Sequence, residues 1–390
     1  MIRYGEEKDF KTAKYIWEEN FSDSEEEINF YFENLYKKEN FLILEENKQI
    51  KASLHENPYT INFNAKLLPS FYIVAVAVSP EFRGRGYMKK LLSYSLINAR
   101  NTGKEILFLS PINTEIYSKF GFGYISGLEN YSLKIDDIPF NSINKSIEIR
   151  KVDENSFDDL VTVYNDYMKK YNLYLFRDEK YFSRIKKELE NEKGQIYSFY
   201  KDNKIIGYLM CYFKKNEIFI REIFYDSIEC VKNMLGFIKT FKEYYSMLKV
   251  VTPQGSNFNF VFPNQLKIEK KEEPYILGRI VNVEKMISLL KIRKNLRIKI
   301  KDSIIAENNG IFLIDVTGQI KKMENDLENY NLSICIEDLT SLLTGYLDIE
   351  ELLVLEKISI KNIDIEELKI VFNKKKNYIQ EYQWKNNLFA

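Results

Sequence analysis

Histidine and cysteine are scarce in this chain of 390 residues, which has one histidine, His55, and three widely spaced cysteines. Zinc sites and catalytic triads depend on these side chains, so their scarcity argues against a zinc enzyme or a triad hydrolase. The cysteines are Cys211, Cys230 and Cys335, an odd number without a close pair. We expect them to be buried apolar residues in a reducing compartment, without a disulfide framework or a metal site.

The chain also lacks a net charge and a long apolar run. Its 57 Lys and Arg residues balance 57 Asp and Glu residues, whereas proteins that bind nucleic acids usually show a basic excess. No apolar segment approaches the roughly 18–20 residues of a membrane span, and the opening MIRYGEEKDF does not resemble a signal peptide. We therefore expect a cytoplasmic protein that binds neither nucleic acid nor membrane. The length of 390 residues is enough for two or three domains, and hydrophobic residues make up 45% of the chain, so a core is available.

Two common phosphate-binding motifs, GxGxxG and the Gly-Lys-Ser/Thr of a Walker A loop, are absent. Residues 71–92 offer a different phosphate site. The apolar run 72–78 predicts a strand buried on both faces, and apolar positions at helical spacing predict a helix over 87–100. Between them lies Arg83-Gly84-Arg85-Gly86. Unpaired N–H groups at a helix N-terminus, two arginines and glycines that permit close approach favour a pyrophosphate. A solvated basic loop is the alternative interpretation.

This stretch resembles motif A of the GCN5-related N-acetyltransferases (GNAT), V-x-V-x-P-x-x-R/Q-x-x-G-x-G/A. The matching residues are Val76, Val78, Pro80, Arg83 and Gly86. Met88 stands where most of the superfamily has glycine or alanine. A larger residue there is similar to one branch, the enhanced intracellular survival (Eis) acetyltransferases.

Residues 1–140 follow the order of elements in the GNAT fold. We expect helices within 3–20 and 25–39, a strand hairpin at 40–44 and 49–55 with its turn at 45–48, and then the motif strand and helix. A strand at 106–109, a short helix at 115–120 and a return into a strand at 121–124 follow. His55 lies on the hairpin, where we expect a partly exposed strand residue rather than a catalytic one.

Residues 145–285 repeat this opening in weaker form. We expect a strand at 147–150, helices within 155–170 and 178–190, and strands at 197–200, 205–213 and 218–224. The turn Lys201-Asp202-Asn203-Lys204 parallels the turn at 45–48. Where motif A should follow, Tyr225-Asp226-Ser227-Ile228-Glu229 contains no basic glycine turn. We interpret this region as a GNAT copy that has lost its cofactor site; a convergent hairpin is the alternative.

Residues 286–390 resemble a sterol-carrier-protein-like domain, through the pattern D-x7-G-x4-D followed by L-S-I-x3-D-L-T-S-L-L-T-G. The residues that carry it are Asp302, Gly310, Leu332, Asp338, Leu339, Leu343 and Gly345. The predicted fold class is thus mixed α/β and α+β: tandem GNAT folds, the second degenerate, and then a sterol-carrier-like α+β domain. The expected domains are 1–144, 145–285 and 286–390. From end to end this arrangement resembles the Eis family.

The resemblance implies roles for individual residues. Tyr117 lies in Ile116-Tyr117-Ser118-Lys119-Phe120-Gly121-Phe122-Gly123, which is similar to the Eis motif I-Y-x-R-F-G-Y-G, whose tyrosine protonates the departing thiolate; a packing role is the alternative. The family's general base is the terminal carboxylate, here that of Ala390, although the ending Phe389-Ala390 differs from the family's aromatic ending. The expected cofactor contacts are Val76, Ala77, Val78, Arg83, Gly84, Arg85, Gly86, Tyr87, Met88, Lys89, Ile112 and Asn113.

These features together predict an acetyl-CoA-dependent N-acetyltransferase without a metal. The backbone N–H of Val78 is expected to polarise the thioester carbonyl. The resemblance implies primary-amine acceptors such as aminoglycosides, polyamines or lysine side chains, and a homohexamer. The alternative is a non-catalytic protein that senses acetyl-CoA or carries a lipid.

Overall fold

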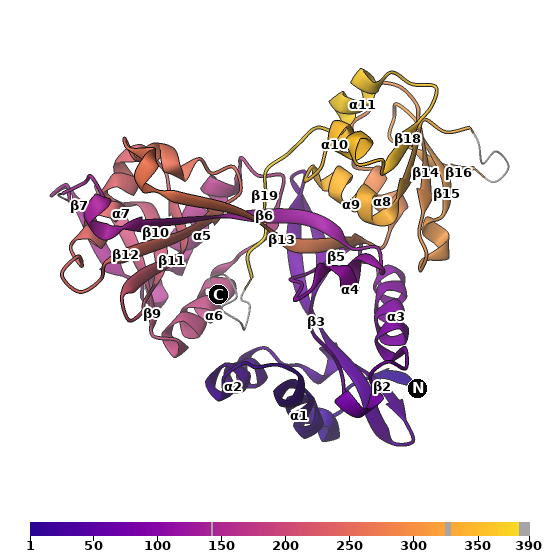
Figure 1. The fold of residues 1–390 in the computed structure, drawn as a ribbon, viewed down its shortest axis with the longest axis horizontal. Coiled ribbons are helices and arrows are strands. Elements are labelled where there is room, and N and C mark those ends of the chain that lie inside the picture. Colours follow the sequence, from indigo (N-terminus) through magenta and orange to yellow (C-terminus); the bar gives the residue numbers. More distant parts are fainter. Residues whose placement is uncertain (142, 324–328, 382–390) are drawn as a thin grey trace. The chain divides into compact units, whose positions relative to one another are not determined.

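The computed structural model describes residues 1–141, 143–323 and 329–381, which form two compact units (Figure 1). The first unit contains Met1–Ser126, Asn172–Phe176 and the chain from Tyr275 onward; the second contains Gly127–Tyr171 and Arg177–Pro274. The domain boundaries expected at 144/145 and 285/286 stay predictions. Within the described residues, no helix has both the length and the apolar character needed to cross a bilayer.

The N-terminal part of the first unit is a sheet with helices on both faces. Its strand order is β1 (Ile2–Tyr4), β2 (Phe41–Glu46), β3 (Gln49–Phe63), β4 (Lys66–Val78), β5 (Ile106–Leu109) and β13 (Glu269–Ile280). In β2, Leu42 and Leu44 join the apolar cluster beneath α3 (Tyr87–Asn101). Phe41 and Ile43 join the cluster beneath α1 (Phe10–Asn20) and α2 (Glu25–Asn34). The strand period of two therefore builds one core on each face.

Tight turns join the long strands of this sheet. Asn47 and Lys48 have φ values of 52° and 61°, and Asn64 and Ala65 have 51° and 61°. Two consecutive residues in the left-handed region are typical of type I′ hairpins. The first turn lies where the sequence predicts one. The second joins β3 to β4, whose strand segments at 56–63 and 66–71 are not predicted from the sequence.

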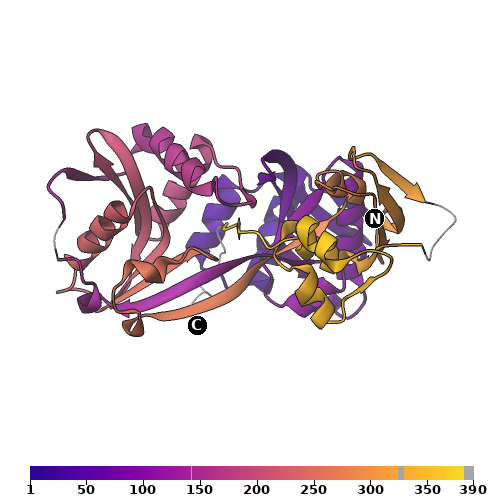
Figure 2. The same cartoon turned by 90° about the horizontal axis from the view of Figure 1, so that it is seen from above.

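The C-terminal part of the first unit is a separate five-stranded sheet with helices beside it (Figures 1 and 2). Its strand order is β16 (Ile320–Met323), β15 (Gly310–Ile314), β14 (Leu296–Lys301), β17 (Leu332–Cys335) and β18 (Ile358–Ile360). Its helices are α8 (Val283–Ile287), α9 (Ile336–Thr344), α10 (Ile349–Val354) and α11 (Ile365–Val371). The sequence predicts strands at 296–302, 311–316 and 332–336 and helices at 337–344, near 348–356 and near 364–372, and the structure has a strand or helix of the predicted type at each place. Cys335 is half-buried, so the expectation that all three cysteines are buried is wrong for this residue.

The second unit repeats the element order of the N-terminal part. It contains β6 (Gly123–Lys134, from residue 127), β7 (Ile147–Lys151), α5 (Phe157–Met168), α6 (Glu179–Asn191), β9 (Gly194–Lys201), β10 (Lys204–Phe213), β11 (Glu217–Tyr225), α7 (Ile228–Lys239) and β12 (Met247–Pro253). The sheet order is β6-β12-β11-β10-β9-β7. Asp202 and Asn203 have φ values of 51° and 60°, so the β9–β10 turn has the geometry of the β2–β3 turn. The second copy expected from the sequence is confirmed as a fold.

Candidate functional site

Strands β4 and β5 diverge at the point where β4 enters the motif. Their parallel register consists of one pair, Tyr72 with Phe108. Beyond that pair, residues 74–78 of β4 have no strand partner on this edge among the described residues. Val74, Val76 and Val78 are accordingly half-buried, which corrects the expectation of a strand buried on both faces. The open edge leaves backbone N–H and C=O groups available to an extended, amide-bearing ligand.

A β-bulge interrupts β4 inside the same segment. His55 of β3 pairs with Val74 and Ser53 pairs with Ala77, so Ala75 and Val76 stand opposite Leu54 alone. Ala75 takes a φ of 51°, a strained value for a residue with a side chain. The extra residue breaks the alternation: Val74 and Ala75 both face the α1–α2 cluster, whereas Val76 faces the α3 cluster. Bulges of this kind redirect side chains beside binding sites.

The turn after β4 leaves the N-terminus of α3 open. Gly86 precedes the helix with a φ of 77°, no side chain caps it, and no acidic residue lies in the first turn. The first backbone bond runs from the Lys90 N–H to the Gly86 carbonyl (3.1 Å), so the N–H groups of residues 87–89 have no acceptor within the helix. A Cβ built on Gly84 or Gly86 would meet nothing within 4 Å. This empty, electropositive space suits an anion such as a pyrophosphate.

The side chains around this turn divide into two groups. Arg83, Arg85 and Lys89 are exposed. Arg83 donates from its guanidinium to the Val78 carbonyl (3.3 Å) and to Asn20 Oδ1 at the end of α1 (2.8 Å), which holds its charge over the turn. Tyr87 and Met88 instead pack partly against the α3 cluster, so Met88 faces the turn with its backbone rather than with its side chain.

Tyr117 lies on α4 (Thr114–Ser118), directly after β5. Its ring meets that of buried Phe122 edge-on, with 6.0 Å between centroids. Within the described residues, its hydroxyl has no hydrogen-bond partner. Burial raises the pKa of Tyr117 to about 12, so the phenol stays protonated at neutral pH. Tyr117 thus presents an unused O–H donor.

The start of α4 is held by local polar contacts. The Asn113 side chain accepts a hydrogen bond from the Glu115 N–H (2.9 Å) and caps the helix. The hydroxyls of Thr114 and Tyr124 lie 2.6 Å apart. Ile112 is 74% exposed. Asn113 therefore has a structural role in addition to the cofactor contact expected of it.

One apolar cluster connects the two halves of the site. Val76, Val78, Tyr87, Met88 and Tyr117 all pack against the cluster that contains Leu54, Leu92 and Leu109. The open strand edge, the glycine turn and the tyrosine are therefore built around the same core. Ala390, the expected general base, lies outside the described residues.

His55 differs from the sequence expectation. It is 2% exposed, not partly exposed, because five rings from α1, α2 and β2 surround it. These rings belong to Trp17, Tyr31, Phe32, Tyr36 and Phe41. Its Nδ1 has no hydrogen-bond partner, and burial lowers its pKa to about 3. The imidazole is neutral at physiological pH and behaves as part of an aromatic core.

The second unit has the same architecture but a different site. Its strand β11 also carries a bulge, at Arg221, and its parallel register with β12 ends at Ile220. Glu222, which follows the bulge residue, is buried and binds Arg177 through contacts of 2.9 and 2.8 Å. Helix α7 is capped by Ser227, which accepts from the Cys230 N–H (3.2 Å). The second unit thus has a buried ion pair beside its bulge, and a self-capped helix in place of the open N-terminus.

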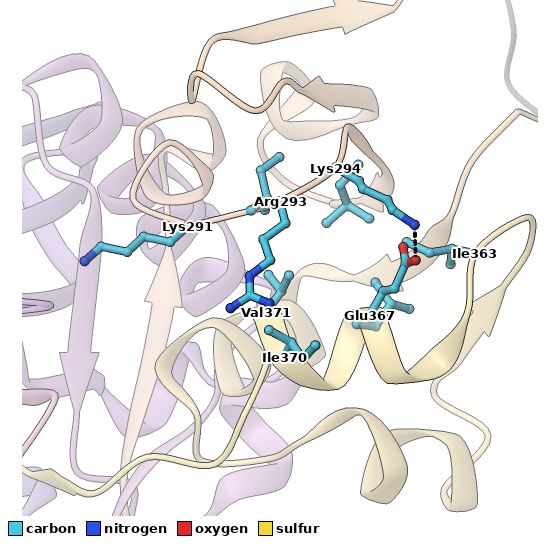
Figure 3. A pocket seen from close by; sticks show the side chains of 10 residues that line it. Lys291, Arg293, Lys294, Ile363, Glu367, Ile370 and Val371 are labelled. Carbon is cyan, nitrogen blue, oxygen red and sulfur yellow. Dashed lines mark hydrogen bonds and ion pairs between the residues drawn. The ribbon is translucent and has the colours of Figure 1, made fainter.

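Two cavities lie in the first unit. A polar cleft of about 740 Å³ borders α1, the β2–β3 turn and the start of the motif turn at Ser79 and Glu81. A smaller pocket of about 260 Å³ lies in the C-terminal sheet domain (Figure 3). Figure 3 shows Lys294 paired with Glu367 at its edge, and Arg293 extending toward Ile370 and Val371.

Family models match two parts of the chain. Residues 1–125 match the acetyltransferase (GNAT) domain, and residues 283–380 match the sterol carrier protein domain. The chain carries a GNAT acetyltransferase domain and a sterol carrier protein domain. Curated proteins provide no match. The GNAT fold implies acetyl-CoA as the co-substrate, and the open turn at Gly84 and Gly86 fits its pyrophosphate.

Solved structures resemble the chain over nearly its whole length. A probable N-acyltransferase from Enterococcus faecalis has a TM-score of 0.86 at 18% identity, covering 98% of this chain and 99% of that one. A GCN5-related N-acetyltransferase from Anabaena variabilis has a TM-score of 0.85 at 18% identity, covering 97% and 98%. Eis1 from Mycobacterium abscessus has a TM-score of 0.77 at 13% identity, covering 97% and 99%. At these identities the likeness establishes the fold.

Sequence reasoning missed two features around the site. The bulge at Ala75 has no local signal, because alanine is not typical of a left-handed position. Arg279 of β13, which contacts the turn after Tyr117, lies in a stretch without a recognisable motif. Asp302 was singled out only as part of the sterol-carrier pattern, and its burial was not predicted.

Proposed function

We propose that this protein is an acetyl-CoA-dependent N-acetyltransferase of the Eis type that acts on primary amines. The observation that carries the proposal is the open N-terminus of α3 beside the unpaired edge of β4, because the equivalent helix of the second unit is capped by its own serine. The GNAT domain match at residues 1–125 supports it. One acetyl-CoA site per chain follows from the contrast between the two copies.

Each part of the motif binds a different part of acetyl-CoA. The N–H groups of residues 87–89 and the side chains of Arg83 and Arg85 bind the pyrophosphate, as charge-assisted hydrogen bonds favour. The β4 edge at Val76, Ala77 and Val78 pairs with the amides of the pantetheine arm. This pairing would bring the Val78 N–H toward the thioester carbonyl, which it polarises as negative charge develops on the oxygen.

The transfer itself forms one bond and breaks another. The neutral amine attacks the carbonyl carbon, the C–S bond breaks, the amine proton goes to a base and the sulfur receives a proton. Tyr117 is the proposed donor to sulfur. A phenol with a pKa of about 12 is a weaker acid than a thiol of about 8.5, so its first contribution is a hydrogen bond to sulfur while charge develops. The terminal carboxylate of Ala390 is the proposed base.

The acceptor is a cation before it reacts, and the polar cleft next to Ser79 suits a cation. Glu19 and Glu81 line this cleft and form no ion pair within the described residues. Asp9 and Glu45, also in its wall, are bound to Arg3 (2.7 Å each). Lys8 and Lys48 also line the cleft, so its charge is mixed, and the two carboxylates without ion pairs are the groups that would contact a cationic amine.

The decisive experiment mixes the full-length protein with acetyl-CoA and a panel of amines and follows thiol release. Tyr117→Phe keeps the ring and its packing but removes the donor, so turnover should fall by roughly 10²–10⁴ with little change in KM. Tyr244→Phe, which removes an exposed phenol from the second unit, is the matched control and should retain activity. Absence of amine-dependent thiol release in the wild type would refute the proposed function.

A second candidate function, carriage of an amphipathic anion, is favoured by the pocket in the sterol carrier protein domain. Its walls include Ile292, Leu296 and Leu368, and its rim carries Arg293 without a partner among the described residues. A fluorescent fatty acid should bind there, and Arg293→Glu should weaken binding about tenfold or more, equivalent to about 1.4 kcal/mol. If Arg293→Glu binds the fatty acid as tightly as the wild type does, this pocket is excluded as the binding site.

The family resemblance also supports a homohexamer. Light scattering coupled to size-exclusion chromatography would test it, since a hexamer and a monomer of 46.5 kDa are easily separated. A monomer in solution would contradict this part of the proposal.

A further inference from the structure

Arg279 is one of the most completely buried side chains of the described protein, with 0% exposure. It lies on β13, paired with Leu107 of β5. Its Nη2 donates to both oxygens of Asp302 (2.7 and 2.8 Å), in the sterol carrier protein domain. Its Nε donates to the carbonyl of Phe120 (2.8 Å), in the GNAT domain. One guanidinium thus joins the two domains of this unit.

The Phe120 carbonyl belongs to the turn that returns from Tyr117. The Tyr117 carbonyl accepts from the N–H of Phe120 (2.9 Å) and from the N–H of Phe122 (3.4 Å). The Phe122 ring contacts the Tyr117 ring. Any movement of this turn would therefore move the Tyr117 side chain.

The sterol carrier protein domain also packs directly against this turn. A Cβ on Gly121, where φ is 78°, would lie 2.6 Å from Ile336 Cγ2 and 2.9 Å from Arg279 Nε. A Cβ on Gly123 would lie 2.1 Å from the Glu337 carbonyl oxygen at the start of α9. No side chain fits at either position, so the two glycines in the Phe-Gly-Phe-Gly segment permit close packing against α9.

Asp302 is held in place by its own network. Its Oδ1 accepts from the N–H groups of Ile304 (2.9 Å) and Ile305 (3.1 Å), and its Oδ2 accepts from Asn308 Nδ2 (2.8 Å). Burial acts to raise its pKa, but the Arg279 guanidinium and these donors outweigh it and lower the pKa. These contacts hold the Asp302 carboxylate in place, and the carboxylate holds the Arg279 guanidinium. The guanidinium then holds the Phe120 carbonyl and the turn to which it belongs.

We propose that the sterol carrier protein domain acts as a positioning element for Tyr117, with Arg279 as the positioning residue and the Gly121–Gly123 turn as the part that it holds. The inference rests on the proposed role of Tyr117 in acetyl transfer. It gives this domain a role in the reaction that requires no ligand in its pocket. Arg279 acts through Tyr117 and touches neither substrate.

The test compares Arg279→Lys with Arg177→Lys. Both arginines are buried and bind a carboxylate through two contacts, but Arg177 lies in the second unit. Lysine offers a point charge in place of a planar fork and cannot serve Asp302 and Phe120 together. Arg279→Lys should lower kcat at least about tenfold, because small misplacements of reacting groups cost that much or more. The KM and the Kd for acetyl-CoA should change less, and Arg177→Lys should leave kcat nearly unchanged.

Two further measurements distinguish a positioning role of Arg279 from a general disturbance of the structure by the substitution. In a Tyr117→Phe background, Arg279→Lys should cause no further loss, since it acts only through the phenol. The deficit should also shrink when an aryl acetyl thioester replaces acetyl-CoA, because its thiolate departs without help from an acid. Additive losses, equal deficits with both donors, or a wild-type kcat in Arg279→Lys would each overturn the proposal.

The outcomes also distinguish a failure of the positioning role of Arg279 from a failure of the proposed acid role of Tyr117, on which it rests. If Tyr117→Phe retains full activity, the acid assignment fails and the positioning role fails with it. If Tyr117→Phe is slow but Arg279→Lys is not, only the positioning role fails. Should Arg279→Lys not fold, Asp302→Asn keeps the shape and one acceptor oxygen, and the same kcat, donor and double-variant measurements apply to it.

Discussion

Acid should destabilise the first unit through His55, the histidine enclosed by aromatic rings. The nearest rings are those of Phe41, Tyr31 and Trp17, with centroids at 4.7, 5.3 and 5.5 Å. Its Nδ1 has no partner, and desolvation lowers the pKa to about 3 from 6.5. A proton on this ring would place an unpaired charge in an apolar core.

The size and sign of the effect follow from these two pKa values. Between pH 6.5 and pH 3, the unfolded chain binds a proton at His55 that the folded chain does not. The stability from this site is therefore fully present above pH 6.5 and is lost as the pH falls toward 3. At 1.36 kcal/mol per unit, the loss between pH 7 and pH 4.5 is about 2.7 kcal/mol.

The assay is urea unfolding of the wild type and of His55→Leu at pH 7, 5.5 and 4.5, both in a Trp384→Phe background, followed by the fluorescence of Trp17. Carboxylates titrate alike in both proteins, so the difference between their pH slopes isolates His55. The wild type should lose about 1.4 kcal/mol more than the variant by pH 5.5 and about 2.7 kcal/mol more by pH 4.5. Parallel pH slopes would show that the ring is hydrated or paired and would refute this reasoning.

Three further predictions concern the proposed site. Arg83→Glu should weaken acetyl-CoA binding tenfold or more, about 1.4 kcal/mol, by calorimetry, whereas Lys180→Glu, the same charge change on the second unit, should leave it unchanged; equal effects would remove Arg83 from the cradle. Acetyl-CoA titration should saturate at one per chain, and two would contradict the contrast between the helix caps. Amidation of the C-terminus should slow amine turnover if the carboxylate of Ala390 is the base, and an unchanged rate would place the base elsewhere.

Much of the fold could be predicted from local patterns. The continuous apolar run of β2 specifies a strand with a core on each face, and the turn at Asn47 and Lys48 fixes its register with β3. The turn at Arg83–Gly86 could also be predicted, because it too depends on local sequence. Glycine and a helix start impose their backbone geometry over a few residues, whatever surrounds them.

Tertiary structure decided what no local pattern encodes. Whether His55 is exposed depends on α1 and α2, which the strand alone does not place. The open edge of β4 arises because β5 leaves it after one pair, which no local sequence pattern specifies. Arg279 donates a hydrogen bond to Phe120, which lies 159 residues away in the sequence. The sequence around a single arginine does not indicate which residue it will contact. The sequence alone therefore determined the glycine turn at the start of α3, and only packing between distant segments determined how Tyr117 is held.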